Sequence, residues 1–83
     1  MKERDIFTPR DATTWLDKSG IGATIEYHRG YIPSDRERFY RVEEVASIML
    51  DAAERGVLHL FQDRRGEFDY RYIAMKRSLK GNR

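Results

Sequence analysis

The segment from residue 42 to residue 55 constrains the fold of this 83-residue chain more than any other part of it. When its residues are placed at 100° intervals, as in an α-helix, every polar side chain falls within an arc of about 120°. The remaining arc holds only apolar residues, Met49 and Leu50 among them. Such a wide apolar face predicts a central helix that is buried on most sides and ends at Gly56.

An earlier segment carries the signals of a second helix over about residues 9–19. Thr8 stands where a helix cap is expected, and Pro9 takes the first helical position. Asp11 takes the third position, where a carboxylate meets free backbone N–H groups. Gly20 followed by Ile21 predicts a stop with a hydrophobic contact behind it.

Three further segments predict a small antiparallel sheet. Residues 23–28 alternate between apolar and polar, which indicates a half-buried strand with Tyr27 on one face and Glu26 and His28 on the other. Residues 57–62 and 68–75 are two β-rich runs joined by residues 63–67, and they predict a hairpin with Arg64 and Arg65 at its tip. One short helical turn is expected at residues 34–37.

These elements predict one small α+β domain over residues 1–83, with an ordered core at about 6–77 and a basic tail at 78–83. Their order is helix, strand, short helix, helix and β-hairpin. This order and the Arg64-Arg65-Gly66 tip resemble the winged helix-turn-helix family over about residues 8–77. In that family the second helix of the pair reads the DNA major groove, and the hairpin, or wing, contacts the backbone or the minor groove. The resemblance implies that residues 42–55 are the recognition helix and that Arg64 and Arg65 are wing contacts.

The charge of the long helix departs from this pattern. Its polar arc sets four carboxylates against the single Arg55, a net charge of −3. Because DNA is a polyanion, an acidic arc aimed at its groove opposes binding. Either DNA would lie elsewhere on the domain, or a winged-helix shape would serve another purpose.

Arginine is favoured among the basic residues, since twelve of the sixteen are Arg and four are Lys. Arginine suits bidentate contact with phosphate, but it equally suits an acidic protein partner, and a coding bias can also produce it. The candidate nucleic-acid surface consists of Arg29, Arg36, Arg38, Arg41, Arg64, Arg65, Arg71, Lys76 and Arg77. The alternative reading gives these residues a solvating role: a loop with its own carboxylates, a charged hairpin tip that keeps the sheet edge soluble, and a basic tail from Lys76 onward.

Catalysis and cofactor binding are not expected. A domain of this size has little room for a deep cleft, and no glycine-rich phosphate loop is present. The two histidines, His28 and His59, lack zinc-site spacing, so no metal site is predicted. No apolar run approaches the roughly 18 residues that cross a bilayer, so no membrane partner is expected. Cysteine is absent, which fits a cytoplasmic protein.

Two functional hypotheses follow. The first is a small non-enzymatic binding module, nucleic-acid-binding or regulatory, of winged-helix type. The alternative is a protein–protein interaction module or a bacterial or phage accessory protein, with a homodimer as one of its forms. It would use the Arg-rich loops or the acidic helix face, whose residues are Glu43, Glu44, Ser47, Asp51 and Glu54. The aromatic residues are assigned to the core and its rim, or else to an exposed row of Tyr70 and Tyr72 with Arg71 between them.

Overall fold

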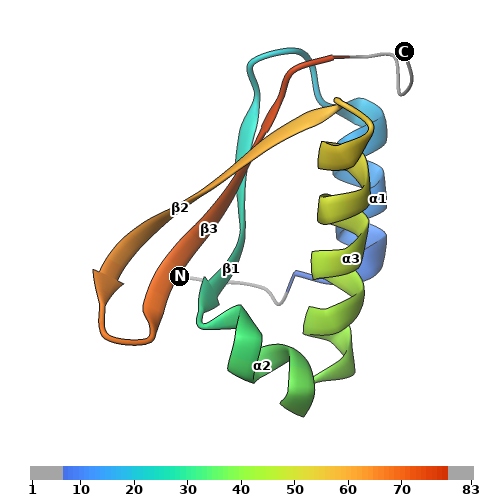
Figure 1. Cartoon of the computed structure of the whole chain (residues 1–83). Coiled ribbons are helices and arrows are strands. Elements are labelled where there is room, and N and C mark those ends of the chain that lie inside the picture. Colours follow the sequence, from blue (N-terminus) through green and yellow to red (C-terminus); the bar gives the residue numbers. More distant parts are fainter. Residues whose placement is uncertain (1–6, 79–83) are drawn as a thin grey trace, which may run out of the picture.

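Three helices cover one face of a three-stranded antiparallel sheet in the computed structural model, which describes residues 7–78 (Figure 1). The elements follow the chain as α1 (Pro9–Lys18), β1 (Thr24–Gly30), α2 (Ile32–Arg38), α3 (Tyr40–Glu54), β2 (Leu58–Gly66) and β3 (Asp69–Lys76). The predicted α+β class and the predicted order of elements are therefore confirmed. The strand order is β1-β3-β2, so β3 is central and β1 and β2 are the edges. Among the described residues, no helix is long and apolar enough to span a membrane.

Helix α1 begins as predicted but ends differently. Thr8 and Asp11 form a reciprocal capping box, in which the Asp11 N–H donates to Thr8 Oγ1 and the Thr8 N–H donates to Asp11 Oδ2. The helix ends at Lys18 with Ser19 as its C-cap, within one residue of the predicted end before Gly20, but the predicted hydrophobic contact of Ile21 is wrong, because Ile21 is 65% exposed.

The carbonyl groups at the end of α1 are satisfied instead by Lys76. Its Nζ donates to Leu16 O at 2.6 Å and to Ser19 O at 3.2 Å. Lys76 is the last residue of β3 and is only 3% exposed, so its assignment to a solvated basic tail is wrong. Its ammonium is buried because three oxygen acceptors surround it, the third being Ser19 Oγ.

Helix α3 supplies the centre of the core, but its apolar arc is only partly covered. Val42, Val45, Met49 and Ala52 are buried, whereas Leu50 is 52% exposed. The reason is the course of the hairpin: β2 starts beside the end of α3 and then diverges from it toward the turn (Figure 1). The prediction of a helix buried on most sides is therefore wrong at Leu50.

The hairpin is longer than predicted. Strand β2 continues to Gly66, and the chain turns at Glu67 and Phe68. Arg64 pairs with Tyr70 across the hairpin, so both candidate wing arginines belong to β2 and not to the tip. Pairing persists past the expected connection through a register irregularity between Arg64 and Gly66, and Phe68 takes a positive φ of 57° in the turn.

Strand β1 does not keep the predicted strict alternation. Its register with β3 shifts between Glu26 and His28, so Tyr27 is buried and His28 lies half-buried against the ring of Tyr72. The predicted sharing of one face by Glu26 and His28 is wrong. Glu26 accepts a hydrogen bond from Arg71, whereas His28 lies against α2.

Candidate binding groove

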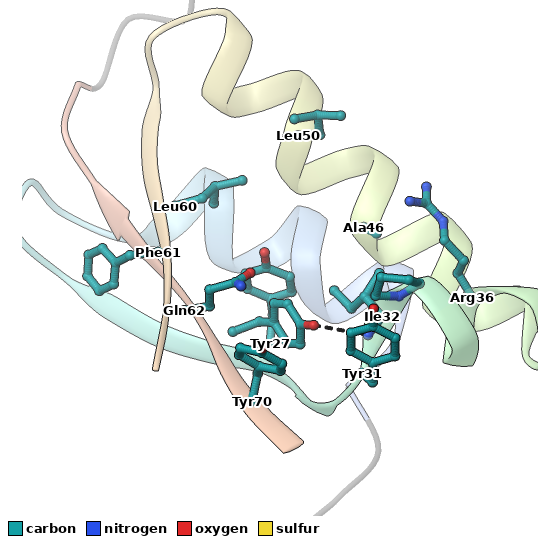
Figure 2. A pocket seen from close by; sticks show the side chains of 12 residues that line it. Tyr27, Tyr31, Ile32, Arg36, Ala46, Leu50, Leu60, Phe61, Gln62 and Tyr70 are labelled. Carbon is teal, nitrogen blue, oxygen red and sulfur yellow. Dashed lines mark hydrogen bonds between the residues drawn. The ribbon is translucent and has the colours of Figure 1, made fainter. Parts of the chain in front are cut away.

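An apolar groove of about 680 Å³ lies between the hairpin on one side and α2 and α3 on the other (Figure 2). Its size and its largely hydrophobic lining are those of sites that hold ligands. Among residues 7–78, Arg36 is the one charged residue that lines it, and no carboxylate does. The lining residues are Tyr27, Tyr31, Ile32, Pro33, Arg36, Ala46, Leu50, Leu60, Phe61, Gln62, Tyr70 and Tyr72.

The floor of the groove is a continuous series of aromatic rings. Tyr31 meets Phe68 edge-on at 5.0 Å and stacks on Tyr70 at 6.1 Å. Tyr70 and Tyr72 lie 6.0 Å apart, and Tyr72 and Tyr27 lie 6.2 Å apart. These centroid distances are within the range of favourable ring pairs, so each ring holds the next in place. Tyr72 is buried and Tyr70 is half-buried against the core, which confirms the assignment of these two rings to the core and its rim, and the alternative of an exposed row is wrong. Arg71 points to the opposite face of the sheet.

Two hydrogen-bonded contacts fix α2 as a wall of the groove. The Ile32 N–H donates to Tyr72 Oη at 3.1 Å, which joins the first turn of α2 to the sheet. Asp35 Oδ2 accepts the Tyr31 N–H at 3.0 Å and lies 2.7 Å from His28 Nε2. Although burial alone would raise the pKa of the Asp35 carboxyl, the contacts with His28 and the Tyr31 N–H together lower it.

Gly30 allows this approach of Asp35 to the strand. It has a φ of +133°, and a Cβ at this position would lie 2.6 Å from Asp35 Oδ2. Both the conformation and the space therefore favour glycine. The wall formed by α2 is set by this local geometry before any ligand binds.

Two tyrosines of the floor have raised pKa values. Burial, with a smaller contribution from Tyr72, raises the pKa of Tyr27 to about 12. Burial also raises the pKa of Tyr72. Tyr27 and Tyr72 therefore offer uncharged rings and hydroxyl groups, which suits apolar and hydrogen-bonding ligands.

Three candidate nucleic-acid residues lie in a charge network on the outer face of the sheet. This network pairs three arginines with three carboxylates, so its charges balance. Its contacts are Arg29 with Asp69 at 2.7 and 3.0 Å, Arg71 with Glu26 at 2.8 Å and with Asp63 at 3.6 Å, and Arg65 with Asp63 at 3.1 Å. These three arginines thus form ion pairs with carboxylates of the chain itself.

The other basic candidates have separate contacts or none. Arg36 Nε donates to Glu43 Oε1 at 2.6 Å, and Arg41 Nη1 donates to Phe7 O at 3.3 Å. The Arg38 guanidinium lies 5.7 Å from the ring centroid of its neighbour Phe39. Within residues 7–78, Arg64 and Arg77 form no ion pair. With Lys76 buried, six of the nine candidates are bound to acceptors of this chain.

The acidic face of α3 is partly neutralised as well. Glu43 also accepts from Ser47 Oγ, and the Arg36 hydrogen bond is the main reason that its pKa is lowered. Asp51 pairs with Arg55 at 3.0 Å. Glu44 and Glu54 form no ion pair in the described part of the chain, so they carry the open negative charge of this face.

Sequence reasoning did not identify the groove. Leu50 was assigned to the buried arc of α3, and Leu60 and Gln62 to the strand alone. One signal was present: an apolar arc of about 240° is wider than a single sheet can cover.

In comparisons with known proteins, no family model, curated protein or solved structure matches this chain.

Proposed function

We propose that this chain is a small non-enzymatic module of winged-helix type that binds a protein segment in the groove between α3 and the hairpin. The observation that carries the proposal is the uncovered apolar wall. Leu50, which is 52% exposed, lies across from Leu60 in one hollow that no described carboxylate lines (Figure 2). Partly exposed aromatic and aliphatic side chains around a preformed hollow are typical of protein interaction sites.

The order of elements and the strand order β1-β3-β2 support the winged-helix part of the proposal. The short α2 and the long α3 form the helix pair, and β2 and β3 form the wing. In this arrangement the groove lies between the wing and the second helix of the pair.

Electrostatics favour a protein over a nucleic acid as the partner. The carboxylates of the outer sheet face balance Arg29, Arg65 and Arg71. The exposed face of α3, which would enter a DNA groove, carries Glu44 and Glu54. Nucleic-acid affinity requires cations that are free to replace counterions, and few of the candidates are free.

One observation supports nucleic-acid binding as a second candidate. Arg64 is exposed on the wing and has no ion-pair partner in residues 7–78. The test is titration with random duplex DNA at low salt. Binding that weakens steeply with salt and is lost in an Arg64→Glu/Arg65→Glu variant would favour this candidate. If the titration shows no binding to DNA, the nucleic-acid candidate is ruled out.

The leading proposal is tested by selecting peptides from a random display library on the immobilised full chain. Affinities of the selected peptides are then measured for wild type, Leu50→Glu and Ile21→Glu. Ile21 is a matched control, because it is as exposed as Leu50 but lies outside the groove. We expect a loss of about tenfold or more with Leu50→Glu and no change with Ile21→Glu. Selected peptides that are insensitive to Leu50→Glu, or the absence of any selected peptide, contradict the proposal.

A further inference from the structure

We infer that the groove takes an extended peptide, which adds as a strand to the free edge of β2 and directs a carboxylate toward Arg36. This inference rests on the proposed function and specifies the chemistry of its partner. Three observations lead to it: the way β2 borders the groove, the charge of the lining, and the spacing of the apolar contacts.

The groove reaches the edge of β2 and not only one of its faces. Leu60, Phe61 and Gln62 are consecutive in β2, and all three line the hollow. Side chains of consecutive strand residues point to opposite faces, and the Phe61 side chain points away from Leu60 (Figure 2), so the hollow borders the strand itself as well as the side chains of one face. Among residues 7–78, β2 pairs with β3 alone, so its other edge has no strand partner. Its free backbone N–H and C=O groups can therefore pair with an added strand.

The charge of the groove selects an acidic segment. Only Nε of Arg36 is engaged, by Glu43, which leaves the donors of its two terminal nitrogens for a ligand. Arg64 stands two residues beyond Gln62 and therefore on the same face of β2, and it adds a second exposed cation at the far end. Glu43, which pairs with Arg36, does not line the hollow, so a peptide carboxylate that enters it meets the free nitrogens of Arg36 and no carboxylate of the described lining.

The side of the groove that faces α3 is apolar, so the ligand residues beside the carboxylate should be apolar as well. Side chains on alternate positions of an added strand would enter the space between Leu60 and Leu50, as those two residues lie across it in Figure 2. The predicted ligand is thus an extended segment that combines β-branched or other apolar residues with Glu or Asp.

The test uses synthetic peptides with blocked termini, titrated into the isotope-labelled full chain and followed by amide NMR. The first probe has valine and glutamate at alternate positions of one strand face, with threonine between them, so that both face the groove. The matched probe has lysine in place of glutamate. A third probe repeats the first with alternate backbone amides methylated, which removes the donors that strand addition needs. The first probe is also measured with Arg36→Gln and with Arg55→Gln, a matched arginine on the exposed face of α3.

We expect the glutamate probe to shift the amide signals of Leu60, Phe61 and Gln62 and to bind at least about tenfold more tightly than the lysine probe. Methylation should abolish binding, and Arg36→Gln but not Arg55→Gln should weaken it. Equal binding of the two charge forms, indifference to methylation, or no binding of the glutamate probe overturns the inference. If the binding of library peptides still depends on Leu50 in that case, the proposed function is retained and only binding by strand addition is rejected.

Discussion

Met49 and Leu50 are neighbours on α3, yet one lies in a closed core and the other in an open groove. Met49 has no exposed surface and belongs to the buried core, whereas Leu50 is 52% exposed. The hairpin lies against the end of α3 and leaves it toward the turn, so that it does not cover the side of α3 that carries Leu50 (Figure 1). Similar side chains on two sides of α3 thus stabilise the fold on one side and remain available to a partner on the other.

Contacts within the chain nevertheless hold the groove in place. The ring series from Tyr31 to Tyr27 and the Ile32 hydrogen bond to Tyr72 hold its floor and one wall. A preformed site loses little conformational entropy when a ligand binds. The comparison therefore predicts different responses of the two regions to the same kind of substitution.

The largest effect is expected in the core, from Met49→Ala. Because Met49 is completely buried, the substitution removes apolar contacts and leaves a cavity. The free energy of unfolding should fall by about 2–5 kcal/mol in chemical denaturation. Met49→Leu, which nearly conserves volume, should cost less than about 1.5 kcal/mol. A small effect of Met49→Ala would mean that the core is not closed there.

A smaller loss is expected where β3 meets α1. Lys76→Met removes the donors to Leu16 O and Ser19 O, and the free energy of unfolding should fall by about 1–3 kcal/mol. Arg77→Met changes the adjacent exposed residue and should stay within about 0.5 kcal/mol of wild type. Equal effects of the two substitutions would show that Lys76 does not cap α1.

Acid should weaken the wall that α2 forms. The folded-state pKa of Asp35 lies below its ordinary value of 3.8, so this carboxylate stabilises the fold above that pH. The stabilisation is lost as pH falls through the folded-state pKa. Thermal unfolding should therefore show a smaller drop in Tm between neutral pH and about pH 3 for Asp35→Asn than for wild type. Parallel drops in the two proteins would contradict this role of Asp35.

The parts of the fold that depend on near neighbours were predicted from the sequence. The capping box of Thr8 and Asp11 spans three residues, and the period of residues 42–55 marks α3. The hairpin and the order of elements followed from alternation and from the glycine-containing connection. Local periodicity was sufficient for the α+β class.

The candidate site depends on contacts between distant residues, and it was not predicted. Arg29 donates to Asp69, forty residues away in the sequence, and Lys76 donates to Leu16 O, sixty residues away. No pattern in the sequence reveals these partners, so the basic residues were grouped as one surface although most of them are paired. The groove arises from the divergence of β2 from α3, a property of the sheet twist that single-residue patterns do not encode.

The most direct test of the account is the stability of a chain in which the exposed helix wall of the groove is shortened, Leu50→Ala. If the groove is open in solution, this side chain buries little area, and the substitution should change the free energy of unfolding by no more than about 0.5 kcal/mol. The binding of library-selected peptides should be lost in the same protein. A loss of stability like that of Met49→Ala would show that the two walls pack together in solution, and that the groove is part of the core.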